Sequence, residues 1–327
     1  MWKGAWNSFH KMFDLKLNEV IDWIRSNNFS SVAVQLPEGL RSKAMEIADS
    51  ISSIDVSVII IGDPCYGACD IRMDNAQALI HFGHSCIPSQ NTKNVFYVEA
   101  RADININIPE NLDKELSGTV GLLATIQYVH MIPKVKEFLE SKGRTVNVSK
   151  GDGRIAYPGQ VLGCNHSSAG PADSYLFIGE GDFHPLAAAF GVKKKMLILN
   201  PISGEIRNVD DVRDRILRKR FAAIQSAKDA ERFLIIVCGK TGQRRDAVAN
   251  DSAKKITEAG KKVYTVVMDE ISPDRLLSYD VDAYINTACP RIAMDDSVRY
   301  RRPMLTPPEL DIVLGSKGWD DYSFDSI

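Results

Sequence analysis

Short, almost uninterrupted apolar runs separated by amphipathic helices constrain this sequence more than any other feature. Residues 56–61 and 233–237 form runs of strand length, rich in valine and isoleucine and far too short to cross a bilayer. Between such runs, apolar residues recur at helical spacing, as at Leu17, Val20 and Ile24. This alternation is typical of parallel strands covered on both faces by helices. The sequence therefore predicts an α/β fold with parallel sheets.

The alternation divides into three similar stretches, which we expect to be three α/β domains. Their expected limits are residues 1–99, 100–203 and 204–327. Helices expected in the second and third stretches stop at Gly143 and Gly260, because glycine readily adopts the left-handed conformation that ends a helix. The stretches share this pattern and not a detectable sequence identity.

The composition argues against several classes of function. The chain has 44% hydrophobic and 25% charged residues and a formal net charge of −2, which is ordinary for a globular protein. A near-neutral chain gives no sign of a nucleic-acid or membrane partner. The opening residues, MWKGAWNSFHKMFDLKL, contain neither the apolar segment nor the cleavage site of a signal peptide. We expect a cytoplasmic protein without a nucleic-acid or membrane partner.

Six cysteines are scattered along the chain, and their positions are informative. Disulfide frameworks belong to small secreted domains, so each is expected to be a thiol acting as a buried apolar residue, a metal ligand or a nucleophile. Cys69 and Cys289 follow expected strands, and sites in open parallel sheets form beyond the carboxyl ends of strands. Cys164 lies in the turn PGQVLGCNH, which can reach that edge. Cys238, inside FLIIVCG, is typical of a buried apolar residue, and Cys86 is ambiguous.

Cysteine spacing does not decide between these alternatives. Cys65 and Cys69 form the only local pair, and the radical-enzyme loop that binds a cluster needs a third cysteine where Arg72 stands. Zinc sites with four cysteines usually contain two CxxC-type pairs, and this chain has no second pair. Three histidines leave a cysteine nucleophile open as well: His81, His84 and His166.

A set of short motifs in a fixed order is more specific than any one of them. The motifs are PEGL at 37–40, YGACD at 66–70, HFGHS at 81–85, PGQVLGCN at 158–165, FIGEGDFHPL at 177–186, ACPR at 288–291 and TPPEL at 306–310. Together they resemble the archaeal-type diphthamide synthases over almost the whole chain. The resemblance implies three Rossmann-like parallel-sheet domains in a pseudo-threefold arrangement around a central iron–sulfur cluster.

The resemblance also implies the cofactors and the ligands. Each domain would give one cysteine to a [4Fe–4S] cluster: Cys69 from YGACD, Cys164 from LGCN and Cys289 from ACPR. The remaining cysteines, Cys65 among them, lie outside the ligand positions of the family. Three ligands on a four-iron cluster leave one iron open, and in the family S-adenosylmethionine occupies it.

The implied activity is the first step of diphthamide biosynthesis, catalysed by a 3-amino-3-carboxypropyl transferase. The reduced cluster cleaves the Cγ–S bond of S-adenosylmethionine, and methylthioadenosine leaves. The carbon fragment adds as a radical species to C2 of a histidine on translation elongation factor 2. Elongation factor 2, an external electron donor and a second copy of the chain in a homodimer are the implied partners. No general acid or base can be named from the sequence.

Four residues are candidates for holding S-adenosylmethionine: Gly179, Gly181, Gln243 and Arg291. The two glycines lie in a loop after an expected strand, where a ligand can approach the backbone. Gln243 is expected to open a helix, whose N-terminus suits an anion. Arg291, two residues after Cys289, offers a cation to the carboxylate of the cofactor. Their ordinary alternatives are a turn, a capped helix start and a surface ion pair.

Three other functions compete with this interpretation. Quinolinate synthase, a dehydrating condensation enzyme, also uses three α/β domains, three cysteines and an open iron. A non-catalytic subunit of a heterodimer is a second alternative, although all three ligand cysteines are retained here. A structural zinc protein is the third. Release of methylthioadenosine distinguishes the transferase from quinolinate synthase, and a structural zinc protein would lack the brown absorbance of a cluster.

Overall fold

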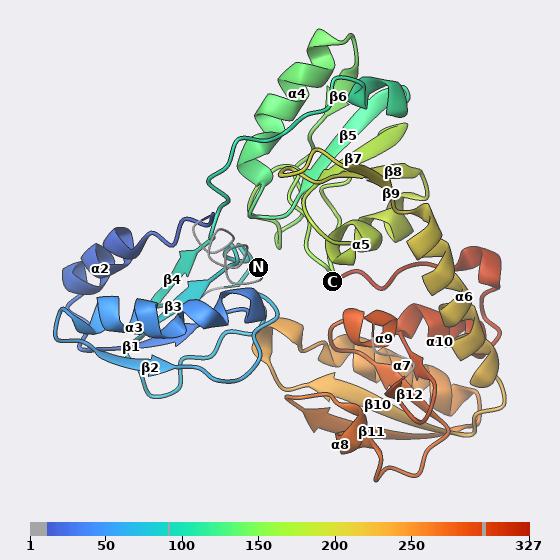
Figure 1. Ribbon diagram of the computed structural model, residues 1–327. Coiled ribbons are helices and arrows are strands. Elements are labelled where there is room, and N and C mark those ends of the chain that lie inside the picture. The colour runs from blue at the N-terminus through green and yellow to red at the C-terminus, as the bar shows by residue number, and fades with distance from the viewer. Residues whose placement is uncertain (1–11, 91, 296–298) are drawn as a thin grey trace, which may run out of the picture. The chain divides into compact units, whose positions relative to one another are not determined.

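The computed structural model describes residues 12–90, 92–295 and 299–327, and it contains three β-sheets with helices between their strands (Figure 1). The strand pairs with a defined residue register are all parallel. The expected α/β fold with parallel sheets is therefore confirmed. In the described part of the chain, no helix has the length and apolar character needed to cross a membrane.

The first sheet has the strand order β2-β1-β3-β4. Its strands are β1 (Ser31–Gln35), β2 (Ser57–Ile60), β3 (Ala78–Phe82) and β4 (Val95–Val98). The associated helices are α2 (Leu17–Ser26), the short 3-10 helix η1 (Glu38–Lys43) and α3 (Ala44–Ser52). The apolar stripe predicted on the first helix is confirmed, since Val20 and Ile24 are fully buried. Helix α3 packs against α2 and β2.

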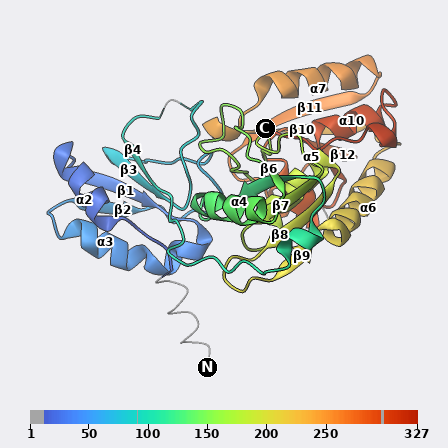
Figure 2. The same cartoon turned by 90° about the horizontal axis from the view of Figure 1, so that it is seen from above.

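The second sheet has the order β6-β5-β7-β8-β9. Its strands are β5 (Thr119–Ala124), β6 (Thr145–Asn147), β7 (Ser174–Ile178), β8 (Lys195–Leu199) and β9 (Ile206–Asn208). Its other elements are η2 (Leu112–Glu115), η3 (Val129–Met131) and α4 (Ile132–Ser141). Helix α4 packs against β5 and β6, and Figure 2 shows this helix together with β6 and β7 of the sheet. It ends two residues before Gly143, whose φ of +83° is the expected left-handed stop.

The third sheet has the order β11-β10-β12-β13. Its strands are β10 (Arg232–Cys238), β11 (Lys262–Met268), β12 (Ala283–Asn286) and β13 (Met304–Leu305). Its helices are α6 (Asp210–Ser226), η4 (Thr241–Gln243), α7 (Asp246–Glu258), α8 (Pro273–Leu276), α9 (Arg291–Asp295), α10 (Pro307–Val313) and η6 (Trp319–Asp321). Helix α7 packs against β10 and β11, and Gly260, with φ +75°, follows its end as expected.

Internal contacts divide the chain into two compact units. The first unit holds the first two sheets, with residues up to Val161 and the segments Ser167–Gly181 and Met196–Arg207. The second unit holds the third sheet, together with Leu162–His166 and Asp182–Lys195. The three expected domain ranges stay a prediction. Strand β9 belongs to the second sheet, although it follows residues 203–204, the expected boundary between the second and third domains.

The expectation that strands are covered on both faces holds for the central strands but not for the edge strands β2 and β11. Strands β1, β3, β7, β10 and β12 are almost wholly buried. The edge strands β2 and β11 alternate between more and less exposed residues, and Tyr264 and Val267 of β11 are more than half exposed. An apolar run therefore marks a strand here, but it does not establish burial of both faces.

Two local expectations need correction. Helix α7 begins at Asp246, so Gln243 lies at the end of η4 and not at a helix N-terminus. The glycine-rich segment after β7 leads directly into a helix that was not expected, α5 (Phe183–Val192). This helix is apolar on nearly all sides, so its sequence lacks the alternation of apolar and polar faces by which a helix is usually predicted.

A buried ion pair holds the helices of the second unit together. Arg220 on α6 and Glu309 on α10 are both fully buried, with Nη2 to Oε2 at 2.5 Å and Nε to Oε1 at 2.8 Å. Arg220 also donates to the carbonyl oxygens of Ala293 and Met304. One side chain thus links α6 to α9, β13 and α10.

Candidate functional site

The loop that carries Cys69 follows β2 and is anchored to β1. Gln35, near the carboxyl end of β1, donates a hydrogen bond through Nε2 to the carbonyl oxygen of Asp70 at 2.7 Å. A Cβ atom at Gly67 would lie 3.3 Å from the Cys69 sulfur, so glycine leaves room around this thiol. Cys69 is partly exposed. The loop therefore presents the thiol at the carboxyl end of the first sheet, as expected.

Cys164 lies in a tight turn held by a distant segment of the second unit. Leu162 and Asn165 exchange two backbone hydrogen bonds around it. The backbone N–H of Ile327 donates to the carbonyl oxygen of Cys164 at 2.9 Å, and the Asn165 amide donates to the carbonyl oxygen of Ile327 at 2.6 Å. Residues 326–327 therefore cover the turn that carries this cysteine.

The Cys289 loop is fixed by Asn286, Arg245 and Asp325. Asn286, the last residue of β12, donates from Nδ2 to the carbonyl oxygen of Cys289 at 2.8 Å. Arg245 donates to the carbonyl oxygens of Thr287 and Ala288, which precede the cysteine. The Asp325 carboxylate accepts two hydrogen bonds from Arg245, at 2.8 and 2.6 Å. Because Asp325 is two residues before Ile327, one short segment contacts both cysteine loops of the second unit.

Arg291 is buried beside these loops and has an unused donor. Its guanidinium lies over the Phe183 ring, and its Nε and Nη2 donate to the Asp295 carboxylate at 3.0 and 2.7 Å. The remaining nitrogen, Nη1, is buried and has no hydrogen-bond partner among the residues that the structure describes. The Phe183 ring occupies the space that a side chain at Gly163 would need, which places the ring next to the Cys164 turn. The structure thus brings Arg291 close to the Cys164 and Cys289 loops.

The other candidates for cofactor binding lie in different surroundings. Gly181 has φ +70° and open space where a Cβ would stand, and Gly179 precedes it in the same loop after β7. Between them, Glu180 accepts a hydrogen bond from the Tyr128 hydroxyl at 2.9 Å, and burial with this carboxylate nearby raises the pKa of Tyr128. Gln243 is buried in the second unit, where its Oε1 accepts from the Cys238 thiol.

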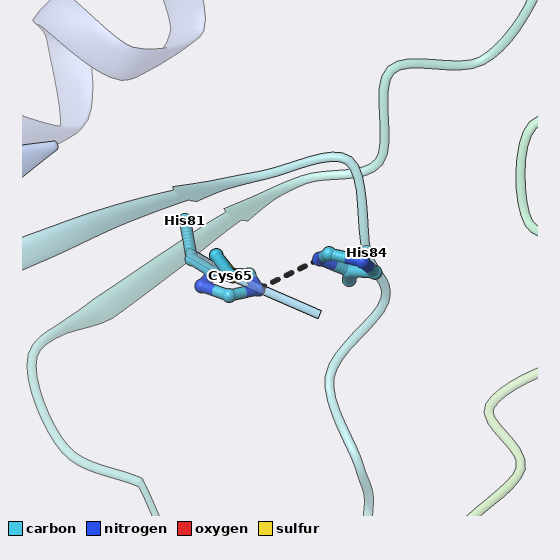
Figure 3. Close-up of side chains that lie close together, drawn as sticks. All are labelled: Cys65, His81 and His84. Atoms are coloured by element: carbon cyan, nitrogen blue, oxygen red, sulfur yellow. Dashed lines mark hydrogen bonds between the residues drawn. The ribbon is translucent and has the colours of Figure 1, made fainter. Parts of the chain in front are cut away.

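A second group of metal-binding side chains lies in the first unit (Figure 3). The ligand atoms of Cys65, His81 and His84 all lie within 4.8 Å of one another. Burial holds the pKa of His81 well below its usual value, and the neighbouring His84 lowers it further. Burial also lowers the pKa of His84 to about 4, although part of this residue remains accessible. Both imidazoles are therefore neutral at pH 7.

Sequence reasoning did not find this group or the role of the 325–327 segment. The family motif does not require a cysteine at position 65, and the irregular loop that brings Cys65 toward β3 has no sequence periodicity that predicts its path. No motif or periodic pattern around Asp325 or Phe183 indicates their contacts with the cysteine loops. The predicted burial of Cys238 is confirmed, and Cys86 is exposed.

Comparisons with known proteins agree on one family. The family model described as a putative diphthamide synthesis protein matches residues 36–323. The chain is 36% identical to the 2-(3-amino-3-carboxypropyl)histidine synthase of Pyrococcus horikoshii, an alignment that covers 97% of this chain and 94% of the relative. It is 29% identical to the enzyme of that name from Methanocaldococcus jannaschii, again over 97% of this chain and 94% of the relative.

Solved structures give the same result. A crystal structure of Dph2 from Pyrococcus horikoshii matches 97% of this chain and 95% of its own, with a TM-score of 0.88 and 35% identity. The crystal structure of that protein with a 4Fe-4S cluster matches 96% of this chain and 94% of its own, with a TM-score of 0.89 and 36% identity. The match extends over all three sheets.

Proposed function

The chain belongs to the diphthamide synthesis family and acts in the first step of diphthamide biosynthesis, and we propose that it transfers the 3-amino-3-carboxypropyl group of S-adenosylmethionine to a histidine of translation elongation factor 2. It is an enzyme, a 2-(3-amino-3-carboxypropyl)histidine synthase. The cofactor, the ligand set and the protein substrate are the parts that we propose here.

The thiols of Cys69, Cys164 and Cys289 suit a [4Fe–4S] cluster as ligands. None of the three forms a disulfide in the described part of the chain, and each lies in a loop held by hydrogen bonds to its backbone or to the residues beside it. Thiolates are the usual ligands of iron–sulfur clusters, and the Pyrococcus relative has been crystallised with one. When bound, the cluster supplies the electron that breaks the Cγ–S bond of S-adenosylmethionine, which releases methylthioadenosine.

The unpaired Nη1 of Arg291 is the single observation that best supports the cofactor site. An unsatisfied buried donor costs about 1–3 kcal/mol, and a carboxylate ligand removes that cost. The methionine part of S-adenosylmethionine carries such a carboxylate. Asp295 and the Phe183 ring hold the guanidinium in one orientation, so that Nη1 is positioned before the cofactor binds. We assign the carboxylate to Arg291.

The loop after β7 and Gln243 supply the other contacts that we propose for the cofactor. Gly179 and Gly181 give the backbone after β7 freedom to approach a ligand, and Gln243 offers a buried amide in the second unit. We also propose a homodimer, an external electron donor and a cytoplasmic location. The archaeal relatives carry the full activity name, whereas the chicken relative is named subunit 1.

The test is to incubate anaerobically purified, dithionite-reduced protein with S-adenosylmethionine and to look for methylthioadenosine by chromatography. Cys69→Ala, Cys164→Ala and Cys289→Ala should each abolish its formation, and Cys86→Ala, at an exposed cysteine, is the matched control. Transfer to elongation factor 2 is then followed by mass spectrometry of its modified histidine. Cluster-loaded protein that yields 5′-deoxyadenosine, or no cleavage, would contradict the proposal.

A further inference from the structure

Cys65, His81 and His84 form a compact donor set that the proposed function does not use. We propose that these three side chains bind a zinc ion at a site of their own, distinct from the cluster ligands. His81 comes from β3, His84 from the turn after it, and Cys65 from the loop after β2 (Figure 3). The proposal does not depend on the proposed function, because it uses only contacts within the first unit.

The spacing suits tetrahedral coordination. Nε2 of His81 and Nδ1 of His84 are 3.0 Å apart, and two nitrogens bound to one zinc at about 2.05 Å stand about 3.3 Å apart. All three ligand atoms lie within 4.8 Å of one another. A thiolate sulfur and an imidazole nitrogen on one zinc stand about 3.6 Å apart, so the sulfur has to approach by at most about 1.2 Å.

The outer contacts of His81 present the correct nitrogen to a metal. Gln35 Nε2 donates to the Asp70 carbonyl oxygen, so its Oε1 faces Nδ1 of His81, at 3.0 Å. Nδ1 must then carry the proton, because a carboxamide oxygen only accepts. Nε2 of His81 is left bare and directed at His84. In a metal-bound histidine, one ring nitrogen binds the metal, and the other usually donates a hydrogen bond to a fixed oxygen.

The donor types favour zinc over harder or softer ions. One thiolate and two imidazoles form a mixed sulfur and nitrogen set, whereas magnesium and calcium prefer oxygen ligands. Zinc arrives from solution, and binding releases the Cys65 thiol proton to solvent, while the His84 proton moves from Nδ1 to Nε2. His84 is partly accessible, which gives the ion and a water ligand a way in. The site thus has three protein ligands and one position for water.

Gly83 explains why the two histidines can face each other. It has φ +81°, and a Cβ there would lie 2.7 Å from the Pro37 side chain. The chain therefore turns sharply directly after β3, and residue 84 comes back toward residue 81. Two histidines at positions i and i+3 on a continuing strand would point to opposite faces.

The first measurement is zinc and iron content per chain of anaerobically purified full-length protein, after incubation with zinc sulfate and desalting. We expect about one zinc in wild type in addition to the cluster iron. Cys65→Ser and His84→Ala should lower zinc affinity by about 100-fold or more in competition with a chelating dye, whereas Cys86→Ser and Cys69→Ala should retain it. Wild type without zinc, unchanged affinity in both ligand variants, or loss of zinc in Cys69→Ala would overturn the site.

Zinc X-ray absorption of the wild type tests the ligands without any variant. One sulfur at about 2.3 Å and nitrogen or oxygen ligands at about 2.0–2.1 Å are expected. Three sulfurs would place the ion on the cluster cysteines, and no sulfur would place it at an adventitious surface position; either result contradicts the proposal.

Discussion

The guanidinium of Arg291 lies over the ring of Phe183, with 4.0 Å between the Cζ atom and the ring centroid. Phe183 opens α5 and rests against Gly163, whereas Arg291 opens α9 just after Cys289. This cation–π contact therefore joins the surroundings of two cysteines that are 125 residues apart in sequence (289 − 164). It also holds the plane of the guanidinium, so that Nη1 has a defined direction.

The first prediction concerns this guanidinium. Arg291→Lys keeps the charge but loses the planar stacking and the fixed donor, so we expect the KM for S-adenosylmethionine to rise about tenfold with a smaller change in kcat. Steady-state release of methylthioadenosine measures both. Arg232→Lys, at a partly exposed arginine paired with Asp280 and Asp282, is the control. An unchanged KM in Arg291→Lys would remove Arg291 from the cofactor site.

The second prediction concerns the segment that contacts both cysteine loops. Asp325→Ala leaves Arg245 without its carboxylate and frees the Thr287 and Ala288 carbonyls to move, so we expect iron and sulfide per chain to fall by about half or more. Anaerobic iron and sulfide assays measure this, with circular dichroism to verify folding. Asp320→Ala, at an exposed aspartate, should keep full iron content. Full iron content in a folded Asp325→Ala protein would contradict the role of this segment.

The third prediction concerns stability. Glu309→Gln leaves the fully buried Arg220 charge without its partner, which should lower the free energy of unfolding by about 3–5 kcal/mol. Urea denaturation measures the change. Glu258→Gln, in an exposed pair with Lys254, should cost less than about 0.5 kcal/mol. The double substitution Arg220→Met with Glu309→Leu should recover part of the loss; if it is no better than Glu309→Gln, the unpaired charge is not the cause.

The fourth prediction concerns pH. Burial alone would raise the pKa of Asp311, but hydrogen bonds from Lys255 and Lys317 outweigh it, and the pKa is lowered. A carboxyl group with a lowered folded-state pKa stabilises the protein above its unfolded pKa of about 3.9, and that stability is lost as the pH falls through the folded value. Asp311→Asn should therefore cost about 1 kcal/mol at pH 7, since both lysines are partly exposed, and progressively less as the pH falls below about 3.9.

Urea denaturation at a series of pH values measures this difference. Asp251→Asn is the matched control, because Asp251 also pairs with Lys255 but is exposed. Its effect should be small and nearly independent of pH. A constant cost of Asp311→Asn between pH 7 and pH 3 would show that the charge of Asp311 does not matter.

Much of the fold was predictable because strands and helices leave periodic traces in the sequence. Runs such as 233–237 became central strands, and Gly143 and Gly260 end α4 and α7 as expected. Helix α5 was missed because it is apolar on nearly every side and contains Pro185. The start of helix α10 is encoded locally, since Thr306 and Glu309 form a capping box around two prolines.

The candidate site was less predictable from residue types alone. Cys69 and Cys289 could be placed because they follow strands, but only the family resemblance selected them from six cysteines. The contacts of Asp325 with Arg245 and of Phe183 with Arg291 join segments that are distant in sequence, and no local pattern encodes them. Cys65 approaches His81 through an irregular loop whose path depends on hydrogen bonds such as Gln35 to Asp70.

The contact between residues 326–327 and the Cys164 turn has a consequence for the order in which this protein matures. Cys164 and Ser326 are 162 residues apart, so the turn leaves the ribosome long before its cover has been synthesised. Arg245 also lacks its carboxylate partner until Asp325 has been synthesised, and Arg245 is the residue that holds the loop leading to Cys289. The nascent chain thus exposes thiols that are not yet held in place. An inorganic group bound to these thiols would therefore meet both loops in their final arrangement only after residues 325–327 have been synthesised.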